Sequence, residues 1–210
     1  MNIVHAHETK KKIIDVARKI FSENGFEGTS IRELAKQAEV NVAAINYHFG
    51  SKEQLFFFII QDAITNLTLS LKLIYENHLI KKTNAEDFFI EVYRYFHKNS
   101  SDIVSTMKVL MSVPMTQKSE MRHIKEIEKG PPGAEYFEKV LIENTQKEIS
   151  AENLHWATTA IFSHITHKTI IMHTCISEED KKNPDYFCSD QDFEKGVRKL
   201  IQSIFLFLKQ

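Results

Sequence analysis

Four histidines in the C-terminal half of this sequence are the residues that most resemble a metal-binding set. They are His155, His164, His167 and His173, and the two central ones are three positions apart, so they share one face of a helix. Zinc sites built on helices or loops add ligands at fixed intervals, as in HExxH or paired CxxC motifs, and neither motif occurs. We therefore expect ordinary core or surface histidines, with no metal and no cofactor.

The sequence also lacks the common motifs of catalysis and phosphate binding. No GxSxG elbow, P-loop or GxGxxG fingerprint is present. Two cysteines, Cys175 and Cys188, do not make a disulfide framework in a chain of 210 residues, and free thiols suit the reducing cytoplasm. We predict a cytoplasmic protein that is not an enzyme, with a zinc-dependent hydrolase as the remote alternative.

A second set of side chains has the chemistry of a cavity for an apolar molecule. Aromatic rings and adaptable methionines recur through residues 85–175. Ordinary core packing produces the same composition, so for any single residue a core position is the competing interpretation. The residues that we predict to line an effector pocket are Tyr93, Phe96, Met111 and Trp156.

Helices must position all of these side chains. The chain has six glycines and four prolines, its Asn24-Gly25 pair follows a helical apolar pattern and not an alternating one, and many apolar residues lie three or four apart, so we predict an all-α protein. No apolar run approaches the roughly 20 residues that span a bilayer, which argues against a membrane protein. The helices are expected over residues 9–23, 31–38, 42–48, 52–78, from 83, near 101–112, 119–129 and 133–148, then 150–174 and from 190 to the end.

Two short helices near the N-terminus have especially clear start signals. Ser30 and Glu33 have the spacing of a capping box, and Asn41 has the side chain of an N-cap for the next helix, which Gly50 closes. Only about three residues separate the two helices, and a long helix follows. This layout is typical of a helix-turn-helix, whose second helix enters a major groove about 12 Å wide.

The stretch from Ile13 to Leu55 closely resembles the N-terminal domain of TetR/AcrR-type regulators. The resemblance implies a DNA-binding domain over residues 7–67, with its helix-turn-helix at about 30–49, and a larger helical effector-binding and dimerisation domain over 68–210. The positions that carry it are Ala17, Phe21, Gly25, Phe26, Thr29, Ser30, Ile31, Leu34, Ala35, Tyr47, His48, Phe49, Ser51 and Lys52.

The resemblance also implies which residues contact DNA. Hydroxyls and free backbone donors at Thr29 and Ser30 would bind one phosphate, and Lys52 would contact another. Tyr47 and His48 would brace the adjacent backbone. Base reading would fall to Asn41, Ala43, Ala44 and Asn46, and the last of these departs from the family, which commonly has tyrosine there. Phosphate contacts fix register, whereas base contacts carry sequence information.

The last helix has more apolar surface than one face can bury. The resemblance implies that the final two helices pair with their copies in a homodimer, whose two-fold symmetry matches palindromic double-stranded operator DNA. We therefore predict a dimeric bacterial repressor that releases DNA when a small apolar or amphipathic effector binds. A TetR-like activator or a metal-responsive sensor is the nearer alternative.

Overall fold

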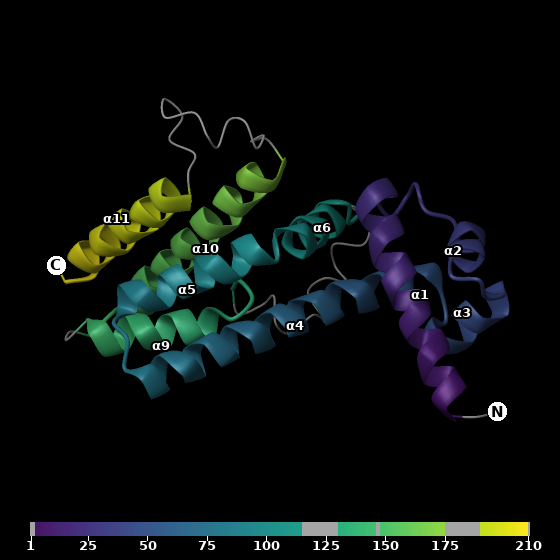
Figure 1. The fold of residues 1–210 in the computed structure, drawn as a ribbon, viewed down its shortest axis with the longest axis horizontal. Coiled ribbons are helices and arrows are strands. Elements are labelled where there is room, and N and C mark those ends of the chain that lie inside the picture. Colours follow the sequence, from purple (N-terminus) through teal and green to yellow (C-terminus); the bar gives the residue numbers. More distant parts are fainter. Residues whose placement is uncertain (1–2, 115–129, 146–147, 175–189, 210) are drawn as a thin grey trace. The chain divides into compact units, whose positions relative to one another are not determined.

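The chain is helical throughout the part that its computed structural model describes, which comprises residues 3–114, 130–145, 148–174 and 190–209 (Figure 1). This confirms the all-α prediction. The helices are α1 (Ile3–Asn24), α2 (Ile31–Gln37), α3 (Val42–Phe49), α4 (Lys52–Lys81), α5 (Ala85–Lys98), α6 (Ser100–Met111), α9 (Ala134–Asn144), α10 (Ala151–Thr174) and α11 (Asp190–Leu208).

Two compact units share these helices. Unit 1 comprises Met1–Thr65 with Ser105–Lys125, and unit 2 comprises Asn66–Val104 with Glu126–Gln210. Helices α4 and α6 therefore each contribute residues to both units. This division differs from the predicted domains because residues 105–111 of α6 belong with the N-terminal helices and not with the C-terminal ones.

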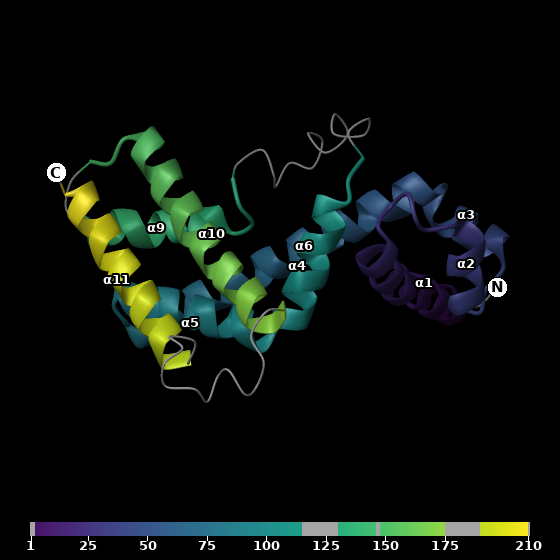
Figure 2. The ribbon, with the colours of Figure 1, turned by 90° about the horizontal axis from the view of Figure 1, so that it is seen from above.

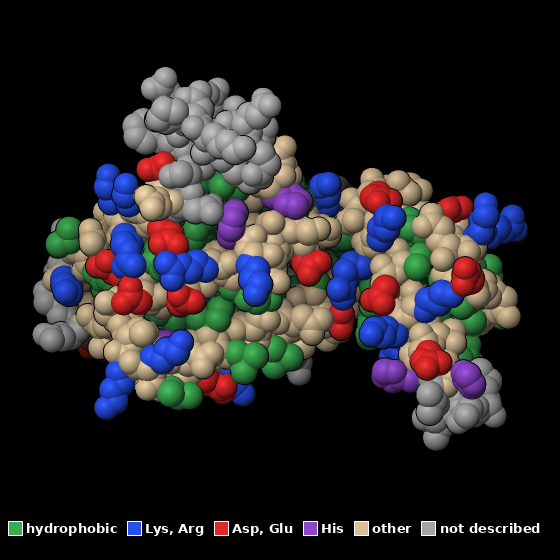
Figure 3. Space-filling view, viewed as in Figure 1, with side chains coloured by type: hydrophobic (Ala, Val, Ile, Leu, Met, Phe, Trp, Pro, Cys, Tyr) green, Lys and Arg blue, Asp and Glu red, His purple; other side chains and the backbone are tan. Residues whose placement is uncertain are grey.

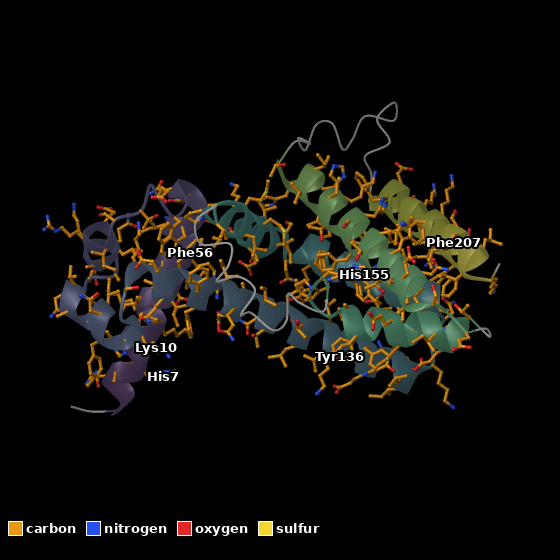
Figure 4. All side chains as sticks on the ribbon, turned by 180° about the vertical axis from the view of Figure 1, so that it is seen from behind. His7, Lys10, Phe56, Tyr136, His155 and Phe207 are labelled. Atoms are coloured by element: carbon orange, nitrogen blue, oxygen red, sulfur yellow. The ribbon has the colours of Figure 1, made fainter. Side chains whose placement is uncertain are left out.

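Unit 1 is built on the apolar face that the sequence shows in its first helix. Ile13, Ala17 and Phe21 of α1 are buried, as are Leu34 of α2 and Ile45 of α3. Phe56 of α4 completes this core; its ring meets those of Phe21 at 5.0 Å and Phe26 at 4.9 Å (Figure 4). Burying large apolar side chains stabilises by about 1.5–3 kcal/mol each, which is what holds three short helices together.

Unit 2 is a bundle in which α5, α9, α10 and α11 pack on one another. Figures 1 and 2 both show α10 and α11 side by side. Phe89 and Phe96 of α5, Phe137 of α9, Ile161 of α10 and Val197 of α11 are buried in the shared core. The aromatic rings meet edge to face, as those of Phe89 and Phe137 do at 5.2 Å.

Several predicted boundaries need correction. Helix α1 begins at Ile3, six residues earlier than expected, and α9 ends at Asn144, not 148. The side chain that caps α5 is Asn84, which accepts a hydrogen bond from the Asp87 N–H at 2.8 Å. The helix expected at 119–129 and the cysteines Cys175 and Cys188 lie outside the described residues.

Helix α4 is long and apolar enough to cross a membrane, by length and composition alone. Its most apolar residues, however, fill the cores of the two units: Leu55, Phe56, Ile59 and Ile60 are buried in unit 1, and Leu71 in unit 2. A helix that is needed in a core has the same composition as a membrane span. Packing therefore explains part of the apolar character of α4, while Leu69, Leu73, Leu79 and Ile80 of the same helix are exposed.

Candidate nucleic-acid interface

Helix α2 starts at the serine that the sequence singles out. Ser30 has an extended backbone, and its Oγ accepts a hydrogen bond from the Glu33 N–H at 3.1 Å. The reciprocal half of a capping box is not formed, because the Glu33 carboxylate accepts from Gln37 Nε2 at 2.7 Å instead. The Ser30 side chain stays exposed at the N-terminus of the helix, where an anion is stabilised by unpaired N–H groups.

Helix α3 is held at both ends. The Asn41 side chain accepts a hydrogen bond from the Ala44 N–H at 2.7 Å. Gly50 ends the helix with a φ of 80°, a conformation that residues with a side chain rarely adopt. In the turn before α3, Glu39 has a φ of 52° and forms an ion pair with Lys12 of α1. The turn is thereby tied to α1.

The two sides of α3 differ sharply. Ile45 and Phe49 face the core, whereas the side of the helix that carries Asn41, Ala43 and Asn46 is exposed. Ala44 and His48, by contrast, are half-buried. Tyr47 is 75% exposed, and its ring meets that of His48 edge to face at 5.1 Å. An exposed large aromatic ring beside small side chains forms a surface that another molecule can approach closely.

Lys52 and Thr29 have structural roles that the sequence did not indicate. The Lys52 ammonium donates to the carbonyl oxygens of Phe26 and Thr29, both at 3.0 Å, and lies 4.1 Å from the centre of the Phe26 ring. Thr29 is only 3% exposed, and its hydroxyl donates to the Gly25 carbonyl at 2.6 Å. Together these two side chains hold the loop that precedes Ser30 and α2.

The family model described as "Bacterial regulatory proteins, tetR family" matches residues 13–58. This segment contains α2, α3 and the loop that Lys52 holds. Among curated proteins, the "Probable HTH-type transcriptional regulator YttP" of Bacillus subtilis (strain 168) is 33% identical over 93 residues, which are 43% of this chain and 45% of that protein. Residues 13–58 of this chain therefore carry a tetR-family segment.

Two further similar proteins extend the match along the chain. The "Biofilm operon icaADBC HTH-type negative transcriptional regulator IcaR" of Staphylococcus epidermidis is 25% identical over 119 residues, which are 54% of this chain and 60% of that protein. The chain thus spans about half the length of these curated relatives. The solved structure of "a transcriptional regulator FadR from Bacillus subtilis in complex with stearoyl-CoA" has a TM-score of 0.64 at 17% identity, covering 93% of this chain and 97% of that one. The fold is shared along almost the whole chain.

The four residues predicted to line a TetR-type effector pocket do not line one cavity in the described structure. Tyr93 and Phe96 are buried in the core of unit 2, whereas Met111 is 86% exposed and belongs to unit 1. Trp156 is half-exposed on α10, where its ring lies 4.9 Å from that of Phe207 on α11. The effector pocket stays a prediction, and helical spacing alone does not distinguish a core ring such as Phe96 from a surface one such as Trp156.

Two grooves in unit 2 went unpredicted. One, of about 410 Å³, is lined by residues at the start of α5 and the end of α11, with Asn144 of α9. The other, of about 270 Å³, lies between α4 and α5 and is lined by His78 and Lys81, among others. Neither contains any of the four predicted pocket residues. Several of their polar residues, such as Asn84 and Lys81, stand at helix ends, where sequence periodicity says little about neighbours.

The histidines that suggested a metal are separated along α10. His155 and His167 are exposed, and His173 Nδ1 lies 3.0 Å from Ser100 Oγ. His164 Nε2 is buried, and burial, followed by the charges of Lys168 and His167, lowers the pKa of this imidazole below its usual 6.5. Within the described ranges no three potential ligands come together in a metal-binding group.

Proposed function

We propose that this TetR-family protein is a sequence-specific, DNA-binding transcriptional regulator that acts as a ligand-responsive dimeric repressor. The observation that carries the proposal is the exposed side of α3, where Asn41, Ala43 and Asn46 stand open beside Tyr47. Small and amide side chains on a helix that projects from a helix-turn-helix suit direct contact with base edges in a major groove. Asn46 is the strongest candidate for base reading, because an amide both donates to and accepts from adenine.

Phosphate contacts surround this helix in the proposal. Ser30 presents its side chain and the N-terminus of α2, while Tyr47 and His48 stand at the C-terminal end of α3. Lys52 retains one of three ammonium hydrogens after donating to two carbonyls, so a phosphate contact is compatible with its role in the loop. Thr29 contributes to the phosphate site indirectly, by holding the loop before Ser30, since its hydroxyl is buried and donates to the Gly25 carbonyl.

We infer that dimerisation uses the outer surfaces of α10 and α11. Trp156 and Phe207 form an exposed aromatic pair, and Leu206 beside them is 68% exposed (Figure 4). In contrast, Val197 and Ile204 of the apolar stripe on α11 are already buried within the protomer. A second copy that covers the aromatic pair would remove the largest rings on this surface from water. Two-fold symmetry would then present two copies of α3 to an operator with inverted half-sites.

Ligand response and the repressor role are supported by two of the similar proteins. IcaR is named a negative regulator, and the FadR structure of the same fold holds stearoyl-CoA. We propose that a small amphipathic molecule binds unit 2 here and lowers operator affinity by favouring a DNA-incompatible conformation. The same proposal implies a cytoplasmic protein without catalytic activity; an activator or a metal-responsive sensor is the alternative reading of the same fold.

Selection from a random duplex library tests this proposal without knowledge of the operator. The purified chain should enrich an inverted repeat. Its affinity for that repeat should fall steeply as the salt concentration rises, because cationic side chains that bind DNA phosphates displace counterions from the DNA. The enriched site, placed at a promoter before a reporter gene, should lower expression when the protein is present. Enrichment of no sequence over several rounds would contradict the proposal. Enrichment with raised expression would favour the activator.

A further inference from the structure

The groove between α4 and α5 has the construction of a small-molecule site. All of its lining residues lie within unit 2, and its volume is about 270 Å³. Its floor is apolar, since Phe88 and Ile90 of α5 are buried and Ile74 of α4 is half-buried. Binding sites for small molecules combine such an apolar lining with a few fixed polar groups. The polar groups of this groove therefore decide what it binds.

His78 is the fixed polar group at the floor. It is only 8% exposed, and its Nδ1 lies 2.7 Å from Thr83 Oγ1. Rings hold it on two sides: Phe88 at 5.3 Å and Tyr75 at 6.3 Å. The imidazole orientation is thus set, and Nε2 is the ring nitrogen that has no hydrogen-bond partner among the described residues. When Thr83 donates to Nδ1, the neutral ring carries its hydrogen on Nε2 and presents a donor to the groove.

Charged groups around the groove are paired, with one exception. The Asp87 carboxylate accepts from Arg198 Nη2 at 3.1 Å, and Glu91 accepts from Arg94 Nη1 at 2.7 Å. Figure 3 shows such cationic and acidic side chains intermixed on this face of unit 2. Lys81, three residues after His78 on α4, has neither an ion pair nor a hydrogen bond within the part of the chain that the structure describes. The charge left without a partner is positive.

We propose that this groove binds a small apolar monocarboxylate. The carboxylate accepts hydrogen bonds from the Lys81 ammonium and from His78 Nε2, and the apolar part lies on Ile74 and Phe88. An amine of the same size would bring a second cation beside Lys81 and would meet carboxylates that arginines already hold. Binding in this groove stands on the geometry of unit 2 alone, whereas its effect on DNA rests on the proposed function.

Titration calorimetry of the full chain with three matched probes tests the ligand class. Phenylacetate should bind, while phenylacetamide, which is neutral, and phenethylamine, which is cationic, should bind about tenfold more weakly or not at all, since hydrogen bonds to charged groups are the stronger ones. Phenylacetate that fails to bind at millimolar concentration, or binds no better than the amide or the amine, would overturn the proposal.

A neighbouring lysine provides the matched control for the site. Lys81→Gln should weaken phenylacetate binding about five- to tenfold, while Lys82→Gln, one residue further on and not in the groove lining, should leave it unchanged. Thr83→Val, which removes the partner of Nδ1 in a similar volume, should weaken binding by a smaller factor with the same helical content. Equal affinity in the two lysine variants would place the carboxylate elsewhere and overturn the assignment.

Operator affinity measured with and without saturating phenylacetate separates this site from the proposed function. A drop in operator affinity that Lys81→Gln abolishes supports both the groove and its role in regulation. Phenylacetate binding that depends on Lys81, in a protein that enriches no DNA sequence, supports the groove and contradicts the regulator. Operator binding in a protein that does not bind phenylacetate supports the regulator and contradicts the groove.

Discussion

The helices of the proposed DNA-binding surface and the helices of unit 2 have apolar and aromatic residues at the same helical spacing, yet these residues are buried to different extents. In α3, Ile45 is buried and Tyr47, two residues later, is open to solvent. In unit 2, Tyr93 and Phe96 are both in the core, whereas the rings of Trp156 and Phe207, on two other helices, are exposed. A helix that binds a DNA duplex must leave one of its sides exposed. In a helical bundle, by contrast, the neighbouring helices determine which side chains are buried. Functional residues can therefore be predicted from the local sequence in the first case, whereas in the second case the tertiary structure is needed.

The largest contrast is expected between two residues that the sequence placed in one pocket. Phe96→Ala should lower the free energy of unfolding by about 3–5 kcal/mol, because it empties a fully packed site. Met111→Ala, at an exposed position, should change it by less than about 0.5 kcal/mol. Urea unfolding of both variants measures the difference. Similar losses for both would mean that Met111 is covered in solution.

Dimerisation gives the next largest effect. Phe207→Asp should separate the protomers and reduce operator binding, because a charge replaces a ring worth roughly 1.5–3 kcal/mol when buried. Leu73→Asp, at a position on α4 that is also exposed, is the control and should remain dimeric. Sedimentation velocity reports the mass of each variant. A dimeric Phe207→Asp protein would move the interface away from α11.

Substitution of Lys52 tests whether its side chain both holds the loop before α2 and contacts a DNA phosphate. Lys52→Met removes two hydrogen bonds to carbonyls, so stability should fall by about 1–3 kcal/mol. Loss of a phosphate contact should also lower the slope of log affinity against log salt by about one. A salt series on the selected operator measures the second effect. Reduced stability with an unchanged slope would leave Lys52 its structural role and remove it from the DNA surface.

The smallest expected effect is the pH dependence from His164. Because burial lowers its pKa in the folded protein, the unfolded chain takes up the proton first, and stability falls as the pH drops below about 6.5. His164→Gln cannot titrate, so its loss of stability between about pH 7.5 and about pH 5.5 should be smaller than that of the wild type. Identical pH profiles for wild type and His164→Gln would show that the ring is solvated.

The sequence predicted most of the fold because its signals are local. The caps at Ser30 and Asn41 and the apolar face of α1 each depend on residues within a few positions, and all three are confirmed. The roles of Lys52 and His78 depend on their hydrogen-bond partners, Phe26 and Thr83 among them. The conformation of each loop determines which residues become these partners. Whether an aromatic ring is buried in the core depends in turn on which helix packs against it. That information lies in tertiary packing, beyond the reach of spacing along one helix.

The most direct test of the account is the base preference of Asn46. Random-library selections with the wild type and with Asn46→Ala should yield operators that differ at one position in each half-site, in symmetric places, with affinities for the wild-type operator differing by about 1–3 kcal/mol. Ser30→Ala should instead weaken binding to all sequences alike. Identical preferred sequences for the wild type and Asn46→Ala would contradict the claim that the exposed side of α3 reads the operator.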